Sequence, residues 1–174
     1  MKATLQARRA LLAQLFPHGV PKLWCPLLTH YTAEGAIDRP RMEAHLAHVA
    51  PHVKGLLAPG STGDGWELTE NESREVVQIV LARVQELNMH LLIGLLRSDL
   101  VGVIHAFLDL GGPFLPGLPT YSPATLVARL RDARVCGFAV CPPHGHGLEQ
   151  ERIRQELTGM LDLGSRRRSI NCRR

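Results

Sequence analysis

One stretch of the chain, Val53 to Arg83, has the pattern of a complete strand, loop and helix, and it constrains the fold more than any other segment. Gly55 to Pro59 is a short apolar run followed by Gly60, which is typical of a strand buried on both faces, as in a parallel sheet. Thr69 with Glu72 three residues later forms a capping box, which predicts the start of a helix. The segment therefore predicts a parallel α/β fold.

The loop of this unit, GSTGDG, carries the residues that indicate binding. Gly60 and Gly63 let a backbone approach a ligand closely, and the hydroxyls of Ser61 and Thr62 offer hydrogen-bond donors. Such a loop suits a small anion, most simply a carboxylate. A glycine-rich turn that only reverses the chain fits the spacing at least equally well. The loop matches neither G-x-x-x-x-G-K-[ST] nor G-x-G-x-x-G, so a nucleotide phosphate site is not supported.

The run GSTGDGWELTENESREVV resembles the signature G-[ST]-T-G-E-x-x-x-L-[ST]-x-E-E-[RK] of the dihydrodipicolinate synthase and N-acetylneuraminate lyase family. Members of that family are (β/α)8-barrel lyases that join pyruvate to an aldehyde, or release it, through a lysine Schiff base. The resemblance implies that Ser61 and Thr62, flanked by Gly60 and Gly63, bind the carboxylate of a pyruvate-like 2-oxo acid. Asp64 stands where the family has glutamate.

Two further segments are similar to the same family. GVPKLWCPLLTHYTAEGAID resembles its opening pattern G-x-x-x-A-L-x-T-P-F and D-G-x-I-D, with Cys25 in place of threonine. VCGFAVCPP and the histidine after it resemble A-D-G-V-L-V-x-T-P-Y-Y, with Cys141 at the threonine and Pro143 and His144 at the two tyrosines. A tyrosine of this segment serves a proton relay in the family, so the resemblance implies that this relay is lost. We interpret His144 and His146 as loop residues.

The length limits how much of a barrel the chain can form. Its 174 residues, 45% of them hydrophobic, suffice for one domain but fall short of the ~250 residues of a complete barrel. We expect an α/β fold, a partial TIM (β/α)8 barrel of about four βα units preceded by an N-terminal helix. The expected divisions are an N-terminal helical extension (residues 1–20), the N-terminal half of a (β/α)8 barrel (21–164) and a basic, disordered tail (165–174).

Periodicity and capping residues predict the individual elements. Strands are expected at 20–26, 55–59, 90–95 and 135–143, and helices at 3–16, from the cap at Asp38 to Pro51, after Thr69, from Ser98 to about Leu110, from Ser122 onward, and at 149–161. The stretch GGPFLPGLPTYSP cannot be a regular helix or a central strand. We expect this insertion to divide the third helix into two pieces.

The helix that Asp38 caps carries His45 and His48, and His52 follows it. His45, His48 and His52 stand at i, i+3 and i+7, close to one helical face. Pro51 ends the helix before His52, and no carboxylate or cysteine stands at ligand spacing. A solvated or interface face is therefore favoured over a metal site, and we expect neither a metal nor a cofactor.

The lysines do not fit the chemistry that the resemblance implies. Lys2 is terminal, while Lys22 and Lys54 stand at the amino ends of their strands, the wrong end for a site at the carboxyl ends. The family continues into strands carrying Y-N and G-x-K, which this sequence lacks. We expect no catalytic residue, because the Schiff-base lysine and the catalytic tyrosine are absent, and a truncated lyase that is inactive alone. The alternative is a non-catalytic fragment, or an assembly partner that binds a fuller homologue.

Charge and cysteine content indicate which partners and which cellular location to expect. The formal charge is +4, but the last ten residues, SRRRSINCRR, hold five of the twenty basic residues, and the rest of the chain has a net charge of −1. A general nucleic-acid footprint is absent, and nucleic-acid binding through the tail rests on those five arginines alone. The four cysteines form no C-x-x-C pair, and no apolar run reaches the roughly 18 residues of a membrane span. We expect a soluble, cytoplasmic protein that binds neither nucleic acid nor membrane; homo-oligomerisation is implied by the family alone.

Overall fold

A single parallel sheet organises the computed structural model, which describes residues 2–17, 19–97, 100–111, 123–141 and 149–166. Its strands are β1 (Trp24–Pro26), β2 (Gly55–Ala58), β3 (His90–Leu95) and β4 (Val135–Val140), which lie side by side in the order β1-β2-β3-β4. All neighbours are parallel, and helices connect them. Consecutive βα units with strands in sequence order are the repeat of a (β/α)8 barrel. The predicted fold class is confirmed.

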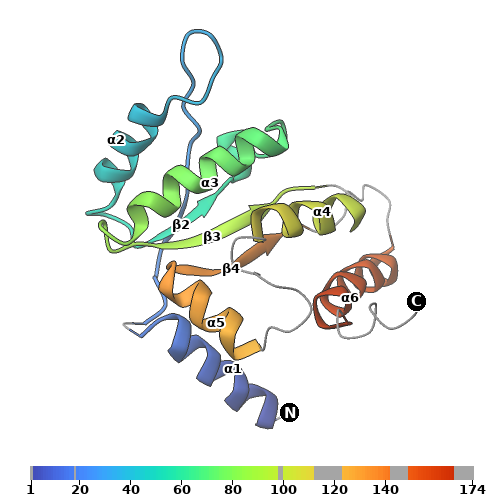
Figure 1. Cartoon of the computed structure of the whole chain (residues 1–174). Coiled ribbons are helices and arrows are strands. Elements are labelled where there is room, and N and C mark those ends of the chain that lie inside the picture. The colour runs from blue at the N-terminus through green and yellow to red at the C-terminus, as the bar shows by residue number, and fades with distance from the viewer. Residues whose placement is uncertain (1, 18, 98–99, 112–122, 142–148, 167–174) are drawn as a thin grey trace.

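Helices connect the strands of this sheet, while the first helix precedes the sheet and the last helix follows it (Figure 1). Of these, α3 contacts β2 and β3, while α4 contacts β3; α2 packs on α3, and α3 on α4. The N-terminal helix packs on α5 instead. Their bounds are α1 (Lys2–Leu15), α2 (Arg39–Val49), α3 (Glu70–Val84), α4 (Leu100–Gly111), α5 (Pro123–Asp132) and α6 (Gln150–Arg166), with one 3-10 turn, η1 (Ser61–Gly63).

The two faces of the sheet differ in burial. Leu56, Leu91 and Ile93 are fully buried and belong to one core with apolar residues of α2, α3 and α4. Leu57 and Leu92, which are paired in register on the alternate face, are only half-buried. A strand between two covered faces would be buried throughout. Within the described chain, therefore, one face of the sheet is covered less completely than the other.

The helix starts follow the predicted caps. The Thr69 hydroxyl accepts a hydrogen bond from Glu72 N at 3.2 Å, and the Glu72 carboxylate accepts one from Thr69 N at 2.8 Å. The Thr69 hydroxyl also donates to the Glu72 carboxylate at 2.6 Å, and this bond, followed by the one from Thr69 N, holds the pKa of Glu72 below its ordinary value. Asp38 caps α2 by accepting from Arg41 N at 3.0 Å. Both predicted caps are confirmed. The sequence could predict them because each cap depends only on residues within one helical turn.

Some predicted boundaries were wrong. The first strand begins at Trp24 rather than Val20, because Trp24 pairs with Gly55, the first residue of β2, and residues 20–23 have no strand residue opposite them. The fourth strand ends at Val140, and 142–148 lie outside the described residues. The third helix is divided into α4 and α5, as predicted, while the intervening 112–122 are not described. The last helix, α6, extends past Leu161 to Arg166, and the remainder of the expected tail lies outside the described residues.

An aromatic layer closes the amino ends of the strands. Phe16, buried just after α1, packs edge-on against Trp24 with ring centroids 6.2 Å apart and lies 5.3 Å from the His90 ring. Gly55 lies between these strands, and a Cβ at this position would come within 2.6 Å of the Trp24 ring. The end of α1 is therefore fixed to the sheet by contacts that require glycine in β2. None of the helices in the described segments has the length and apolarity needed to traverse a bilayer.

Candidate functional site

The hydroxyl loop stands at the carboxyl end of β2. Gly60 precedes η1, in which Ser61 and Thr62 are exposed while Gly63 is buried. In parallel α/β folds, ligands bind at this end of the strands. The structure therefore places the predicted substrate-binding residues at the carboxyl end of β2, with Ser61 and Thr62 exposed and Gly60 and Gly63 buried. Their role in binding stays a prediction.

The loop after β1 fixes the position of this turn. The Thr29 hydroxyl donates a 2.6 Å hydrogen bond to the carbonyl oxygen of Gly63. A Cβ on Gly63 would lie 2.3 Å from the carbonyl oxygen of Leu27, so only glycine allows this approach. The contact explains why the turn needs its buried glycine.

The end of β3 closes the loop from the other side. A Cβ on Gly94 would lie 1.9 Å from the carbonyl oxygen of Pro59, and one on Gly65 would lie 2.7 Å from the Leu96 side chain. Gly65 also donates its N–H to Gly60 O at 3.0 Å. The segments after β1, β2 and β3 are therefore packed backbone against backbone, and the exposed hydroxyls project from a well-supported turn.

Tyr31 and Asp64 form a polar pair beside the turn. Burial, followed by the negative charge of Asp64 and a side-chain hydrogen bond to it, raises the pKa of Tyr31 to about 12. Glu72 and Glu67 raise it further. Sequence reasoning missed Tyr31, because its only signal was its position in the loop after the first strand. Asp64 itself has a left-handed backbone with φ of 56°, which aspartate tolerates better than most residues.

The charges at this edge are mixed. Asp64 and Glu67 add negative charge beside the hydroxyl pair, which disfavours an anionic ligand. Arg97 follows β3 on the same edge, and its guanidinium donates to Leu96 O at 2.7 Å. Tyr31 lies beside Asp64, whose negative charge favours the neutral phenol. The net charge near this turn therefore does not by itself favour an anion, and the hydroxyls of Ser61 and Thr62 are the donors that the turn offers.

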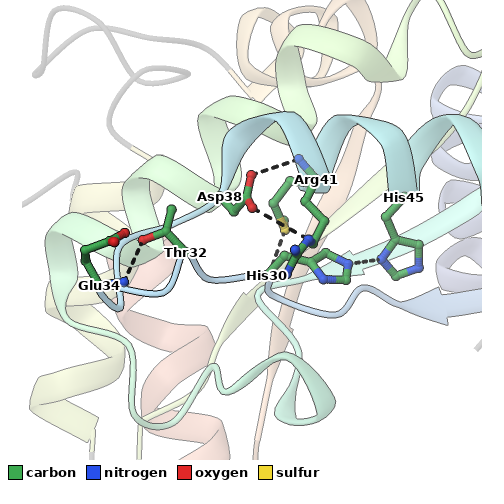
Figure 2. Close-up of polar contacts among 7 residues, drawn as sticks. His30, Thr32, Glu34, Asp38, Arg41 and His45 are labelled. Carbon is green, nitrogen blue, oxygen red and sulfur yellow. Dashed lines mark hydrogen bonds and ion pairs between the residues drawn. The ribbon is translucent and has the colours of Figure 1, made fainter.

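The histidine cluster differs from its prediction. His45 Nδ1 lies 2.8 Å from His30 Nε2, so the two rings from the loop after β1 and from α2 face each other (Figure 2). His45 is half-buried, and its pKa is lowered by burial and then by His30 and His48. The sequence favoured a solvated or interface face for the three histidines. His48 and His52 are exposed, with ring centroids 6.3 Å apart, whereas His45 is paired with His30. Spacing within α2 could not reveal His30, which comes from another segment.

The two imidazoles do not extend into a metal-binding group. Across the described residues, His, Cys, Asp and Glu side chains form no group of three or more with the arrangement of a metal site. Met42 Sδ accepts a hydrogen bond from His30 N at 3.3 Å. A single hydrogen bond between the rings, with one nitrogen donating, accounts for the short distance.

The remaining predicted positions lie away from the turn or outside the described residues. Lys22 and Lys54 lie at the amino ends of β1 and β2, and Lys2 begins α1. Cys25 is half-buried in β1, and its thiol contacts Pro26 O at 3.6 Å. Cys141 follows β4. His144 and His146 fall outside the described residues.

Comparison of the amino-acid sequence with known families and curated proteins gives no match. No protein-family model matches the chain, and no curated protein matches it significantly. The fold, in contrast, has counterparts among solved structures.

Three structures illustrate that likeness. YagE, a prophage protein of the dihydrodipicolinic acid synthase family from E. coli K12 in complex with pyruvate, is 18% identical with a TM-score of 0.60 over 80% of this chain and 40% of its own. The 2-keto 3-deoxygluconate aldolase from Picrophilus torridus is 19% identical with a TM-score of 0.59, over 80% and 43%. CdNal from Clostridium difficile in complex with mannosamine is 17% identical, also with a TM-score of 0.59, over 80% and 42%.

The share of each matched structure that this chain covers agrees with the four strands of its sheet. The chain spans about two fifths of the length of the structures it matches, and its sheet supplies four parallel strands in sequence order. At this level of identity the likeness concerns the fold. The chain has the fold of an N-terminal half of the TIM barrel seen in structures of the dihydrodipicolinate synthase and N-acetylneuraminate lyase family.

Proposed function

We propose that the turn after β2 binds the carboxylate of a pyruvate-like 2-oxo acid through the hydroxyls of Ser61 and Thr62. The observation that supports the proposal most is the exposure of both hydroxyl residues at the carboxyl end of a buried parallel strand. Gly60 and Gly63 allow the tight turn that presents them. The pyruvate complex of YagE, which shares this half-barrel fold, supports the choice of ligand.

The reaction class we propose is that of a Schiff-base, aldolase-type lyase, of which this chain supplies the carboxylate receptor. In that chemistry a lysine amine adds to the ketone carbon of pyruvate and water leaves, which gives an imine that accepts electrons. The three lysines of the sequence lie in α1 or at the amino ends of the strands, away from the turn. We therefore propose that this chain alone holds the 2-oxo acid without forming the imine.

Pyruvate binding to the purified chain, followed by ligand-observed NMR, tests the proposal. Ser61→Ala and Thr62→Val should each raise the Kd for pyruvate by about tenfold, the effect of one hydrogen bond to a charged group. Thr158→Val is the matched control, because its exposed hydroxyl only donates to Arg154 O within α6. Equal pyruvate affinity in all four proteins would refute the assignment.

Borohydride reduction in the presence of pyruvate tests the lack of imine chemistry. The mass of the reduced chain should not change, because no lysine reaches the turn. A stable adduct on Lys22 or Lys54 would show that the site lies elsewhere, at the amino ends of the strands.

A second candidate is a binding role as an assembly partner of a fuller homologue. The open sheet favours it: β1 and β4 each pair with a single strand among the described residues, and Leu57 and Leu92 are incompletely covered. Native mass spectrometry of a mixture with a complete family member distinguishes the two roles. A stoichiometric complex supports assembly, whereas an unaltered monomer counts against it.

A further inference from the structure

A cavity lies at the opposite end of the sheet from the hydroxyl turn. Its volume is about 410 Å³, which is within the range of small-molecule sites. The segment before β1 forms one wall, and the residues that lead into β2 and β3 form the other. The lining residues are Gly19, Val20, Pro21, Lys22, Leu23, His52, Val53, Lys54, Asn88 and His90.

The polar residues of this cavity are predominantly hydrogen-bond donors. Lys22 and Lys54 contribute two ammonium groups, and no acidic residue is among the described residues that line the cavity. Lys54 Nζ uses one proton on Ala50 O at 2.7 Å, which leaves two for a ligand. A site with two ammonium groups and no carboxylate favours an anion.

Asn88 is oriented as a donor by a neighbouring cation. Arg134 Nη1 donates to Asn88 Oδ1 at 2.7 Å. Because a guanidinium can only donate, the amide oxygen must face Arg134, and the amide N–H2 group is left for other acceptors. The bond also brings a third positive charge next to the lining. Two imidazoles, those of His52 and His90, add further polar groups to the wall.

The rest of the lining is apolar and fits an organic body. Val20 and Leu23 are exposed, at 49% and 60%, beside the buried Val53. The cavity is much larger than a bare inorganic anion, so an anionic head alone would leave these side chains in water. A ligand with a small organic part would cover them and gain from burial of apolar surface.

We propose that this cavity binds a small organic phosphate monoester, with its phosphate between Lys22 and Lys54 and its organic part against Val20 and Leu23. A phosphate monoester carries a charge close to −2 at neutral pH, which two ammonium groups neutralise. Its oxygens accept several hydrogen bonds at once, which matches the Lys and Asn88 donors. This site is independent of the hydroxyl turn, which lies at the other end of β2.

The test measures binding of glycerol 3-phosphate to the full chain by isothermal titration calorimetry, with glycerol and inorganic phosphate as comparisons. Glycerol 3-phosphate should bind, inorganic phosphate should bind more weakly, and glycerol should not bind. Lys22→Gln and Lys54→Gln should each raise the Kd by about tenfold. Lys2→Gln is the matched control, because it removes the same charge at the start of α1.

The outcomes separate this site from the turn. Circular dichroism of each variant establishes that it is folded, and Ser61→Ala should leave glycerol 3-phosphate binding unchanged. Failure of glycerol 3-phosphate to bind, or an unchanged Kd in both Lys22→Gln and Lys54→Gln, would overturn the proposal. Inorganic phosphate binding as tightly as the ester would overturn the organic part of it.

Discussion

Thr29 and Gly63, from the loops after β1 and β2, are joined by a hydrogen bond of 2.6 Å from the threonine hydroxyl to the glycine carbonyl oxygen. The bond is partly buried and spans thirty-four residues of sequence. It fixes the turn that presents Ser61 and Thr62 relative to the neighbouring strand. The support of the turn therefore comes from a different segment of the chain.

Removal of this bond should weaken both the fold and the turn. Thr29→Val leaves the Gly63 carbonyl without its donor and should lower the free energy of unfolding by about 1 kcal/mol, measured by urea denaturation. Pyruvate affinity should fall as well, because the turn is held less tightly. Thr29→Ser keeps the hydroxyl and is the control. Equal unfolding midpoints for Thr29→Val and Thr29→Ser would contradict the prediction.

Gly94 should tolerate no side chain. A Cβ at Gly94 would approach Pro59 O to 1.9 Å, and both partners are fixed in the core of the sheet. We expect Gly94→Ala to lower the free energy of unfolding by about 3 kcal/mol. Gly60→Ala, whose nearest contact would be 3.3 Å from Pro26 Cβ, should cost about 1 kcal/mol or less. Similar midpoints for the two variants in urea would show that the approach of β3 to Pro59 is not tight.

The phenol of Tyr31 should lose its proton at a higher pH than a free tyrosine, in part because of Asp64. Burial of the phenol and the charge of Asp64 raise its pKa from 10.0 to about 12. Asp64→Asn should lower this pKa without restoring the ordinary value, because burial is the larger cause. The pKa of Tyr31 is measured from the phenolate absorbance of the Tyr121→Phe variant, in which Tyr31 is the only tyrosine. An identical titration with and without Asp64 would exclude the pair.

The raised pKa of Tyr31 predicts that the free energy of unfolding falls at high pH. The folded chain favours the neutral phenol, so the contribution of Tyr31 is complete below pH 10 and is lost as the pH rises toward 12. Tyr31→Phe should make the free energy of unfolding less dependent on pH in this window. Chemical denaturation at pH 9 and at pH 11 measures the difference. A steeper loss in Tyr31→Phe would contradict the direction of the shift.

His45 should make the fold sensitive to mild acid. Burial and the neighbouring His30 and His48 lower its pKa, so the unfolded chain binds the proton more readily. Its contribution to stability is complete above the ordinary value of 6.5 and is lost as the pH falls below it. His45→Gln should flatten the decline of the unfolding free energy between pH 7 and 5, measured in urea. His52→Gln, at an exposed position that is not among the causes of the shift, should keep the decline of the unaltered chain.

Local patterns predicted most of the elements. Thr69 and Glu72 stand three residues apart, so the capping box could be identified from the sequence, and the apolar runs at 55–58 and 90–95 gave two central strands. The start of β1 was placed too early because an edge strand extends only as far as its neighbour does. Strand length in a sheet is set by pairing, which a single segment does not encode.

The sequence by itself determined the alternation of strands and helices and the hydroxyl pair at a strand end, because hydrophobic periodicity and capping act within a few residues. Only the tertiary structure decided that His30 meets His45, that Tyr31 lies beside Asp64, and that Lys22 and Lys54 line one cavity. His30 and His45 stand fifteen residues apart within the connection from β1 to β2, whereas the other two groupings join residues from different connections of the sheet. Their distances depend on how parallel strands pack side by side, and spacing along the chain carries no record of that.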